Sequence, residues 1–162
     1  MPLIHLTTFI LAPIERVFDL SRSIDFHVAS MPESNETVID GITPGLINVD
    51  ETVTWQAQHL FKKRTLVSKI TSMKPYTFFE DTMITGDFKS LRHEHHFKQV
   101  ENGTIMIDLF YFEVSFGMIG QFFNNIYLKG YMKKLLQQRN DHLKHALENN
   151  TWKKYLQETV SL

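Results

Sequence analysis

The chain contains no cysteine, and this absence excludes several kinds of chemistry at once. Without thiols it has no disulfide, no cysteine nucleophile and no cysteine-ligated metal, which agrees with a reducing compartment. The opening stretch MPLIHLTTFILAPIERVF has neither the basic start nor the small-residue cleavage site of a secretory signal, and no apolar run reaches membrane-spanning length. We therefore expect a cytoplasmic protein without integral membrane association.

The chain also lacks an excess of either charge. Its 17 Lys and Arg residues stand against 18 Asp and Glu residues, a formal net charge of -1 at pH 7 with neutral histidines. So small a charge produces no overall field that attracts nucleic acid or anionic lipid. We expect a neutral or mixed-polarity small molecule as partner, no nucleic acid, and no cofactor.

The length of 162 residues suits one domain, and a hydrophobic content of 43% with 13 phenylalanines is enough for a sizeable core. We expect a single domain over residues 1–148. We expect residues 149–162 to be a helical extension or tail, in which Trp152, Tyr155 and Leu156 either pack back or stay mobile. The protein is expected to be a monomer or a homodimer.

The hydrophobic period changes twice along the chain. A strand is indicated at 3–11, followed by a helix from Pro13 and a second short helix at about 23–30. Alternating patterns then predict an antiparallel meander, whose strands are expected at Val38–Ile39, 51–60, 63–73, 76–84, 88–99 and 104–114.

From about residue 117 the period is helical again, with an apolar stripe over roughly thirty residues. A helix this long is expected to lie along the sheet and cover it, which gives an α+β fold. Curved strands do not pack evenly on a cylinder, so we expect a cavity between the sheet and this helix. The stripe consists of Ile119, Phe122, Phe123, Ile126, Tyr127, Met132, Leu135, Leu136, Leu143, Ala146 and Leu147.

The octapeptide SLRHEHHF at 90–97 holds three histidines and a glutamate. Successive side chains of a strand point to opposite faces. One face therefore carries Arg92, Glu94, His96 and Lys98, which suit solvent. The other carries Leu91, His93, His95 and Phe97, so two imidazoles are expected to face the cavity.

The turn after this strand decides where Asp108 lies, and two arrangements are open. A two-residue turn at Asn102 and Gly103 pairs Glu101 with Thr104 and turns Asp108 inward. Phe97 then faces Asp108, His95 faces Phe110, and His93 faces Phe112. A three-residue loop with a bulge instead turns Asp108 outward, opposite His96.

We favour the two-residue turn because it gives a coherent inner set, namely Met106, Phe110, Phe112 and Val114. It also leaves Ile107, Leu109 and Tyr111 on the outer face, where they suit a dimer contact.

Histidines and carboxylates inside an apolar cavity need partners, because unpaired buried polar groups cost a few kcal/mol each. His59 and Asp81 are expected to join His93, His95 and Asp108. Three interpretations stay open for His93, His95 and Asp108: a structural polar network, hydrogen bonds that orient a ligand, and general acid/base catalysis. The His-x-His spacing is also a metal-ligand geometry that His59 or Asp108 would complete, but no second metal motif appears and we predict no metal site.

Aromatic and aliphatic side chains are expected to line the same cavity, although each also suits plain core. Phe122 and Phe123 follow the stretch GMIG, whose glycines would let the start of the helix act as a gate. His27 and Ser30 suit the cavity mouth. The expected ligand wall consists of Trp55, Phe97, Phe110, Phe112, Phe122, Phe123 and Ile126.

Several stretches together resemble a known family. They are IDFHVASM at 24–31, GITPGLI at 41–47, VTWQAQHL at 53–60, RHEHHF at 92–97, NGT at 102–104 and MID at 106–108, with Pro75, Phe79, Asp81, Gly86, Phe88, Phe112, Gly117 and Gly120. Up to about residue 148 the chain resembles the SRPBCC superfamily, also called START-like or Bet v1-like. It looks closest to the bacterial ligand-binding members labelled polyketide cyclase/dehydrase-like.

This resemblance implies a helix-grip fold, a curved antiparallel sheet around a C-terminal helix with a hydrophobic cavity beneath it. The family includes lipid carriers, hormone receptors, plant allergens and aromatase/cyclases, so the fold alone does not select an activity. The chain departs from the usual pattern at NGT, at Ser115, where a proline is usual, and at HLF (59–61), where HFG is usual.

We expect the protein to bind a hydrophobic or aromatic small molecule, such as a lipid or a polyketide-like metabolite. One alternative is a cyclase or dehydratase in which the inward histidines and aspartate move protons. A second alternative is an interaction domain that dimerises through Ile107, Leu109 and Tyr111. A pH-dependent turnover would favour the first alternative, and a dimer in solution the second.

Overall fold

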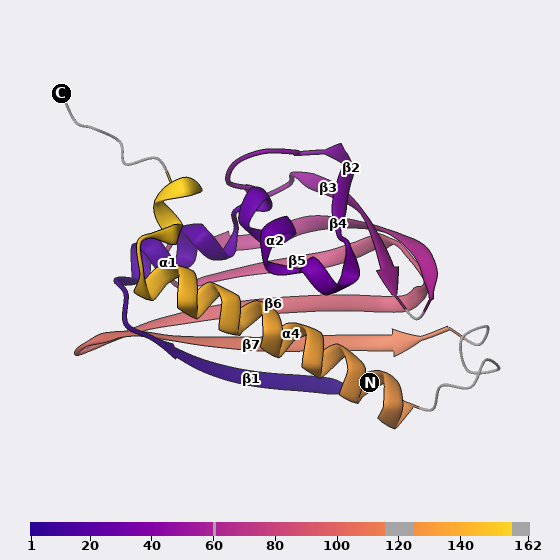
Figure 1. Cartoon of the computed structure of the whole chain (residues 1–162). Coiled ribbons are helices and arrows are strands. Elements are labelled where there is room, and N and C mark those ends of the chain that lie inside the picture. The colour runs from indigo at the N-terminus through magenta and orange to yellow at the C-terminus, as the bar shows by residue number, and fades with distance from the viewer. Residues whose placement is uncertain (60, 116–124, 157–162) are drawn as a thin grey trace.

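The computed structural model describes residues 1–59, 61–115 and 125–156. Strands and helices follow one another in the expected order (Figure 1). The elements are β1 Leu3–Ile10, α1 Ile14–Ser21, α2 Ile24–Ser30, η1 Pro32–Ser34, β2 Thr37–Gly41, β3 Thr52–His59, β4 Lys62–Lys74, β5 Phe78–Thr85, β6 Phe88–Val100, β7 Gly103–Val114, α4 Asn125–Glu148 and η2 Thr151–Lys154.

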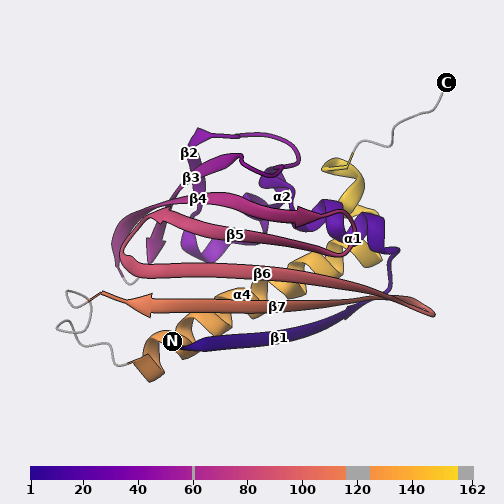
Figure 2. The same cartoon turned by 180° about the vertical axis from the view of Figure 1, so that it is seen from behind.

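The seven strands form one antiparallel sheet in the order β1-β7-β6-β5-β4-β3-β2. The first strand thus pairs with the last, and the remaining strands follow as a meander (Figure 2). The pairing shifts register within β2–β3, β4–β5 and β6–β7. Such irregularities increase the local bend and twist of a sheet, which lets it curve around a helix.

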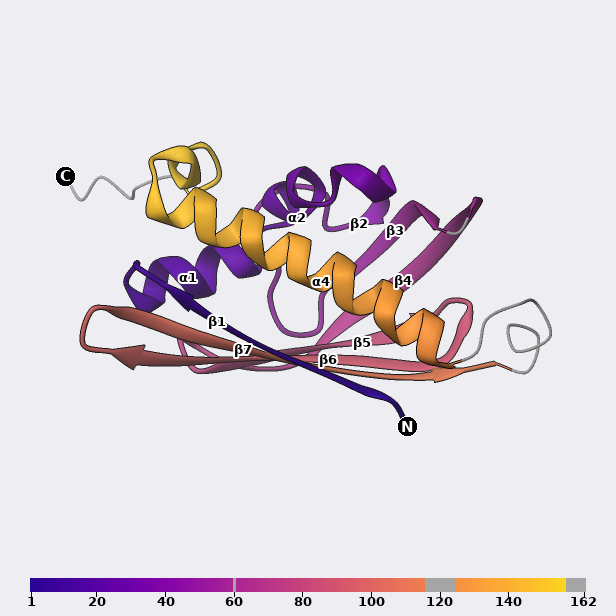
Figure 3. The same ribbon diagram turned by 60° about the horizontal axis from the view of Figure 1, so that its bottom comes forward.

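Helix α4 lies across the inner face of this sheet, and α1 and α2 lie beside the C-terminal half of α4 (Figure 3). The architecture confirms the predicted α+β helix-grip fold. Phe122 and Phe123, the expected gate, lie outside the described residues. In the described part of the chain no helix is both long enough and apolar enough to cross a bilayer.

Two groups of buried apolar side chains fill the space between helices and sheet. The larger one joins α1, α2 and the end of α4 to the strands and includes Phe18, Phe79 and Leu143. The smaller one lies under the first half of α4 and includes Leu128 and Phe112. They provide the apolar contacts that hold α4 against the sheet.

The segment after α4 returns to the core. Trp152 in η2 is buried, and the guanidinium of Arg16 lies 3.9 Å from the centre of its ring. Tyr155 and Leu156 pack against the same buried group, and the Tyr155 ring meets Phe26 edge-on. Of the two alternatives for these three side chains, packing back is therefore observed.

The hairpin between β6 and β7 corrects the predicted register. Val100 pairs with Gly103, so the two-residue turn consists of Glu101 and Asn102 rather than Asn102 and Gly103. A Cβ at position 103 would collide with the carbonyl of Ile10 at the end of β1. Gly103 is thus needed for close packing of β1 and not for the turn.

All predicted pairs across this hairpin are consequently wrong by two residues. His95 lies opposite Asp108, His93 opposite Phe110, and Phe97 opposite Met106. A shift of two preserves the face of every side chain, because strand side chains alternate with a period of two. Asp108 points inward as predicted, and the bulged alternative that turned it outward is wrong.

Candidate functional site

A cavity of about 210 Å³ lies between the inner face of the sheet, α2 and α4, and apolar side chains make up most of its wall. A single water needs about 10–15 Å³ of such space, so there is room for an organic molecule. The side chains on α4 that face it are Leu128, Tyr131, Met132, Leu135, Leu136 and Arg139. The cavity thus lies where the curved sheet was expected to part from the helix.

Six of the predicted ligand-binding residues line this cavity, three others do not, and Phe122 and Phe123 lie outside the described residues. Those that line it are Trp55, His59, Asp81, His93, His95 and Phe110. Phe97 and Phe112 are buried outside its wall, and Asp108 lies behind the two histidines. Ile126 was predicted to face the cavity, but its side chain is 80% exposed.

Packing explains why Phe97, Phe112 and Ile126 do not line the cavity. The ring of Phe97 packs against Phe18 and Phe79 in the larger core, at centroid distances of 5.3 and 5.8 Å. Phe112 is fully enclosed in the smaller core. Ile126 precedes the buried Leu128 by two positions, about 200° of helix rotation, and so lies on the opposite side of α4.

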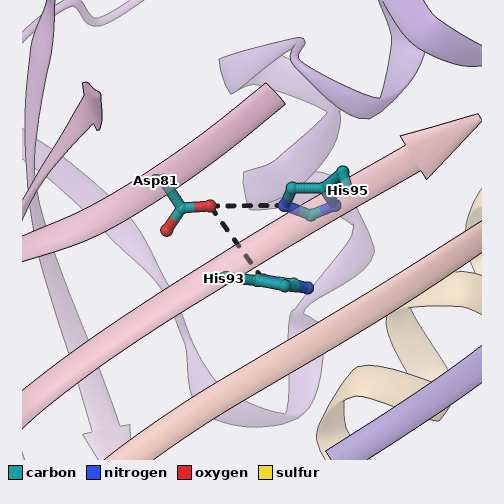
Figure 4. Close-up of side chains that lie close together, drawn as sticks. All are labelled: Asp81, His93 and His95. Atoms are coloured by element: carbon teal, nitrogen blue, oxygen red, sulfur yellow. Dashed lines mark hydrogen bonds and ion pairs between the residues drawn. The ribbon is translucent and has the colours of Figure 1, made fainter. Parts of the chain in front are cut away.

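One polar part of the cavity wall belongs to a group that we call the histidine–aspartate cluster, in which Asp81, His93 and His95 line the cavity and Asp108 lies behind them. The cluster spans three neighbouring strands, because Asp81 lies on β5, the histidines on β6, and Asp108 on β7. His95 Nε2 lies within hydrogen-bond distance of Asp81 Oδ2 at 3.2 Å, and His93 Nδ1 lies 4.0 Å from the same oxygen (Figure 4). His93 Nε2 donates to Asp108 Oδ1 at 3.0 Å.

His95 is held firmly in place. Its ring stacks on Phe79 at a centroid distance of 4.2 Å and lies 3.8 Å from the ring of His93 on its own strand. His95 Nδ1 lies 2.9 Å from Asp108 Oδ1, in a direction unsuited to a hydrogen bond, so this contact is electrostatic. Both imidazoles therefore turn one nitrogen toward Asp108 and the other toward Asp81.

The carboxylate of Asp108 is 1% exposed and depends on α4 for its remaining partners. Asn140 Nδ2 donates to Asp108 Oδ2 at 2.6 Å, and Asn140 also contacts Thr8 on β1. Arg139 donates to the carbonyl of Ser21, with NH1 3.9 Å from Asp108 Oδ1. These contacts join the long helix to the centre of the sheet.

The surroundings shift the pKa values of the cluster in different directions. Burial would raise the pKa of Asp108, but contacts with His93 and His95 hold it well below the usual range. Burial lowers the pKa of His93, and the neighbouring His95 lowers it further. Burial also disfavours a charged His95, but the carboxylates of Asp108 and Asp81 outweigh it and raise its pKa. The two histidines thus differ in their tendency to carry a proton.

A second polar group, the Glu36 cluster, lines another part of the cavity and consists of His27, Glu36, His59 and Tyr131. His27 Nε2 lies 2.7 Å from Glu36 Oε2, and His59 Nδ1 lies 3.0 Å from the Tyr131 hydroxyl. His59 Nε2 is 3.9 Å from Glu36 Oε1. His59 therefore belongs to this cluster and does not join His93 and His95 as predicted.

Four polar residues of the site were not predicted from the sequence, namely Arg139, Asn140, Tyr131 and Glu36. The first two had a signal, because the pair interrupts the apolar stripe of α4 at positions where helical spacing continues from Leu135 and Leu136. A polar pair on a core-facing stripe indicates buried partners. Glu36 carried no such signal, since it precedes β2 in an irregular segment.

Comparisons with known proteins identify the fold, but they show no closer relationship. Neither protein-family models nor curated proteins match the chain. Among solved structures, the protein TTHA0849 from Thermus thermophilus is similar with a TM-score of 0.69 at 17% identity, covering 90% of this chain and 99% of that one. Ara h 8.0201 is similar with a TM-score of 0.66 at 10% identity, covering 91% and 99%.

A third similar structure is the di-domain ARO/CYC StfQ from the steffimycin biosynthetic pathway. Its TM-score is 0.71 at 9% identity, with 92% of this chain and 52% of that chain covered. These likenesses agree with the predicted resemblance. The chain has the Bet v1-like helix-grip fold that these structures share.

Proposed function

We propose that this protein binds a hydrophobic or aromatic small molecule in the cavity between the sheet and α4, with a polar group of the ligand at the histidine–aspartate cluster. The observation that carries the proposal is the cavity itself, apolar in most of its wall but with Asp81, His93 and His95 on one part of it. Apolar walls supply binding energy through area, and a few fixed polar groups orient the ligand.

The chemistry of the wall indicates what the ligand carries. Trp55, Phe110 and the aliphatic side chains of α4 suit an aromatic or lipid-like body. Asp81 accepts hydrogen bonds, and His93 Nδ1 lies 4.0 Å from it, too far for a direct hydrogen bond. With its ring proton on Nε2, His93 also presents an acceptor at Nδ1, so a ligand group that donates hydrogen bonds, such as a hydroxyl, matches this pair. Polyketide-like aromatics with phenolic hydroxyls and hydroxylated lipids meet both requirements.

Native mass spectrometry of the protein purified from its own host tests the proposal directly. We expect a mass increase from one co-purifying small molecule, lost on denaturation. A matched pair of probes then tests the role of the polar wall: 2-naphthol, which carries a hydroxyl, and naphthalene, which does not. We expect 2-naphthol to bind about tenfold more tightly, since one hydrogen bond to a charged group contributes about 1.5–3 kcal/mol.

The variant His95→Gln should reduce this preference for the hydroxyl and leave the affinity for naphthalene nearly unchanged. Absence of any bound molecule, together with no measurable affinity for either probe, would contradict the proposal. Binding without turnover separates the proposed function from the alternative of acid/base catalysis. If the isolated ligand is converted and both His93→Gln and His95→Gln abolish the conversion while binding survives, the cyclase or dehydratase alternative holds instead.

A further inference from the structure

The arrangement of Asp81, His93 and His95 has the features of a metal-binding site as well as of a hydrogen-bonding wall. We propose that these three side chains bind one divalent transition-metal ion of the zinc or iron(II) class on the cavity wall. The inference goes beyond ligand binding and does not depend on it, because the ion would be held by the protein alone.

The donor atoms of Asp81, His93 and His95 have the spacing of a metal site. One carboxylate oxygen and one nitrogen from each histidine all lie within 4.8 Å of one another, and Figure 4 shows the three side chains. Residues 1–59, 61–115 and 125–156 contain no other such group. A zinc ion binds nitrogen and oxygen at about 2.0–2.2 Å, so tetrahedral ligand atoms lie about 3.4 Å apart. The Asp81 oxygen lies 3.2 Å from His95 Nε2 and 4.0 Å from His93 Nδ1.

Asp108 lies behind the two histidines, where it orients both rings. A histidine that binds a metal almost always donates its other ring N–H to a carboxylate, a carbonyl or water, which fixes the ring and its tautomer. Here one carboxylate oxygen accepts a hydrogen bond from His93 Nε2 at 3.0 Å and lies 2.9 Å from His95 Nδ1, where its negative charge favours a proton on that nitrogen. Protons on these two nitrogens leave His93 Nδ1 and His95 Nε2 with free lone pairs, both on the side of Asp81.

An ion can reach the three side chains from the cavity. All three ligand residues line the cavity, and Asp81 keeps 23% of its side chain exposed. Two imidazoles and one carboxylate with an open fourth position form the kind of site that holds catalytic zinc or non-haem iron(II). The open position would take water or an oxygen atom of a cavity ligand. Rigid strands carry all three side chains, so little ordering is needed when the ion binds.

Zinc chloride titrated into the EDTA-treated, dialysed full-length protein tests the inference by calorimetry. We expect one tight zinc ion per chain, with affinity reduced at least 100-fold in Asp81→Asn and in His93→Gln. Asp108→Asn should weaken binding about 10- to 100-fold, as expected for a residue that orients ligands from behind. Cobalt(II) bound to the wild-type protein should show the visible absorption typical of low-coordinate cobalt. This absorption should be lost in the same variants.

The matched control is His96→Gln. His96 lies on the same strand but on the opposite face of the sheet, where it pairs with Glu94 at 2.9 Å, so zinc binding should be unchanged. Circular dichroism and urea unfolding verify that each variant is folded. Because Asp81 is only partly buried, Asp81→Asn is the variant least at risk of unfolding.

Zinc that binds no more tightly to the wild type than to folded Asp81→Asn would overturn the inference. So would tight binding that His96→Gln abolishes. The affinity for 2-naphthol, measured in the presence of EDTA, is independent of both results. Loss of the metal site with intact 2-naphthol binding therefore rejects the metal alone, whereas failure of 2-naphthol binding rejects the proposed function alone.

Discussion

His95 lies directly opposite Asp108 in the β6–β7 ladder, and its Nδ1 is 2.9 Å from the carboxylate oxygen that also accepts a hydrogen bond from His93. One oxygen of this buried carboxylate thus contacts both imidazoles, and Asn140 on α4 donates a hydrogen bond to the other oxygen. A cavity wall with two inward histidines depends on this support, since unpaired buried polar groups are costly. Asp108 therefore holds the two histidines of the cavity wall in place and also stabilises the fold.

Asp108→Asn should lower the free energy of unfolding by about 3 kcal/mol, because removing one partner of a buried ionic network leaves the others uncompensated. Urea unfolding at pH 7 measures the loss. The matched control is Glu113→Gln on the same strand, whose carboxylate is 43% exposed and pairs with Lys89 on the surface. The control should change stability by less than about 0.5 kcal/mol. Equal effects of the two substitutions would contradict the assigned role of Asp108.

A substitution that fills the cavity should reduce ligand binding without harming the fold. Ala57 on β3 is buried and lines the cavity, so Ala57→Phe places a ring in the space that the ligand needs. We expect the affinity for 2-naphthol to fall about tenfold or more, measured by fluorescence titration. Gln58→Phe adds the same ring at the next position, which is exposed and points to the other face. Weaker binding in Gln58→Phe but not in Ala57→Phe would place the ligand elsewhere.

Much of the fold followed from periodicity, and the inward face of the histidine strand followed from alternation alone. The register did not, because Asn102 and Gly103 suggest a turn by local preference while Gly103 is needed for the approach of Ile10 from β1. That contact joins two distant parts of the chain, and no local pattern carries it. The face of Asp108 was nevertheless correct, since the error of two residues preserves the alternation.

The two polar clusters differ in how far the sequence revealed them. Asp81, His93, His95 and Asp108 come from three adjacent strands of a meander, so their grouping followed from antiparallel pairing. The Glu36 cluster instead combines α2, β3, α4 and an irregular segment. Its members meet only when the helices pack on the sheet, and His59 was assigned to the wrong group for this reason. Tertiary packing determines which residues form the Glu36 cluster, and local sequence patterns do not carry this information.

The Glu36 cluster should make stability depend on pH in the acid range. Burial would raise the pKa of Glu36, but the charge and hydrogen bond of His27, together with His59 and Ser34, lower it below its ordinary value of 4.5. A carboxyl group with a lowered pKa in the folded state contributes stability above its ordinary pKa. The contribution is lost as the pH falls through the lower, folded-state value.

Glu36→Gln removes this contribution, so its free energy of unfolding should lie below that of the wild type at pH 6 and approach it as the pH falls below about 4.5. Urea unfolding at intervals from pH 6 to pH 3 measures the difference. Glu33→Gln, three residues earlier and exposed, is the control and should follow the wild-type curve. A constant gap between Glu36→Gln and the wild type across the range would show that the carboxylate is not the cause.

The same chemical change at two glycines should have opposite effects. Gly103→Ala should destabilise the protein by about 1–3 kcal/mol, because the added methyl group collides with the Ile10 carbonyl and separates β1 from the hairpin. Gly130→Ala should stabilise it by about 0.5–1 kcal/mol, because Gly130 lies in α4 with open space around its Cβ position and alanine is the better helix former. Thermal and urea unfolding of both variants measure the two signs. Unchanged stability of Gly103→Ala would mean that β1 moves away from the added methyl group at no cost in free energy. The explanation of the hairpin register would then be wrong.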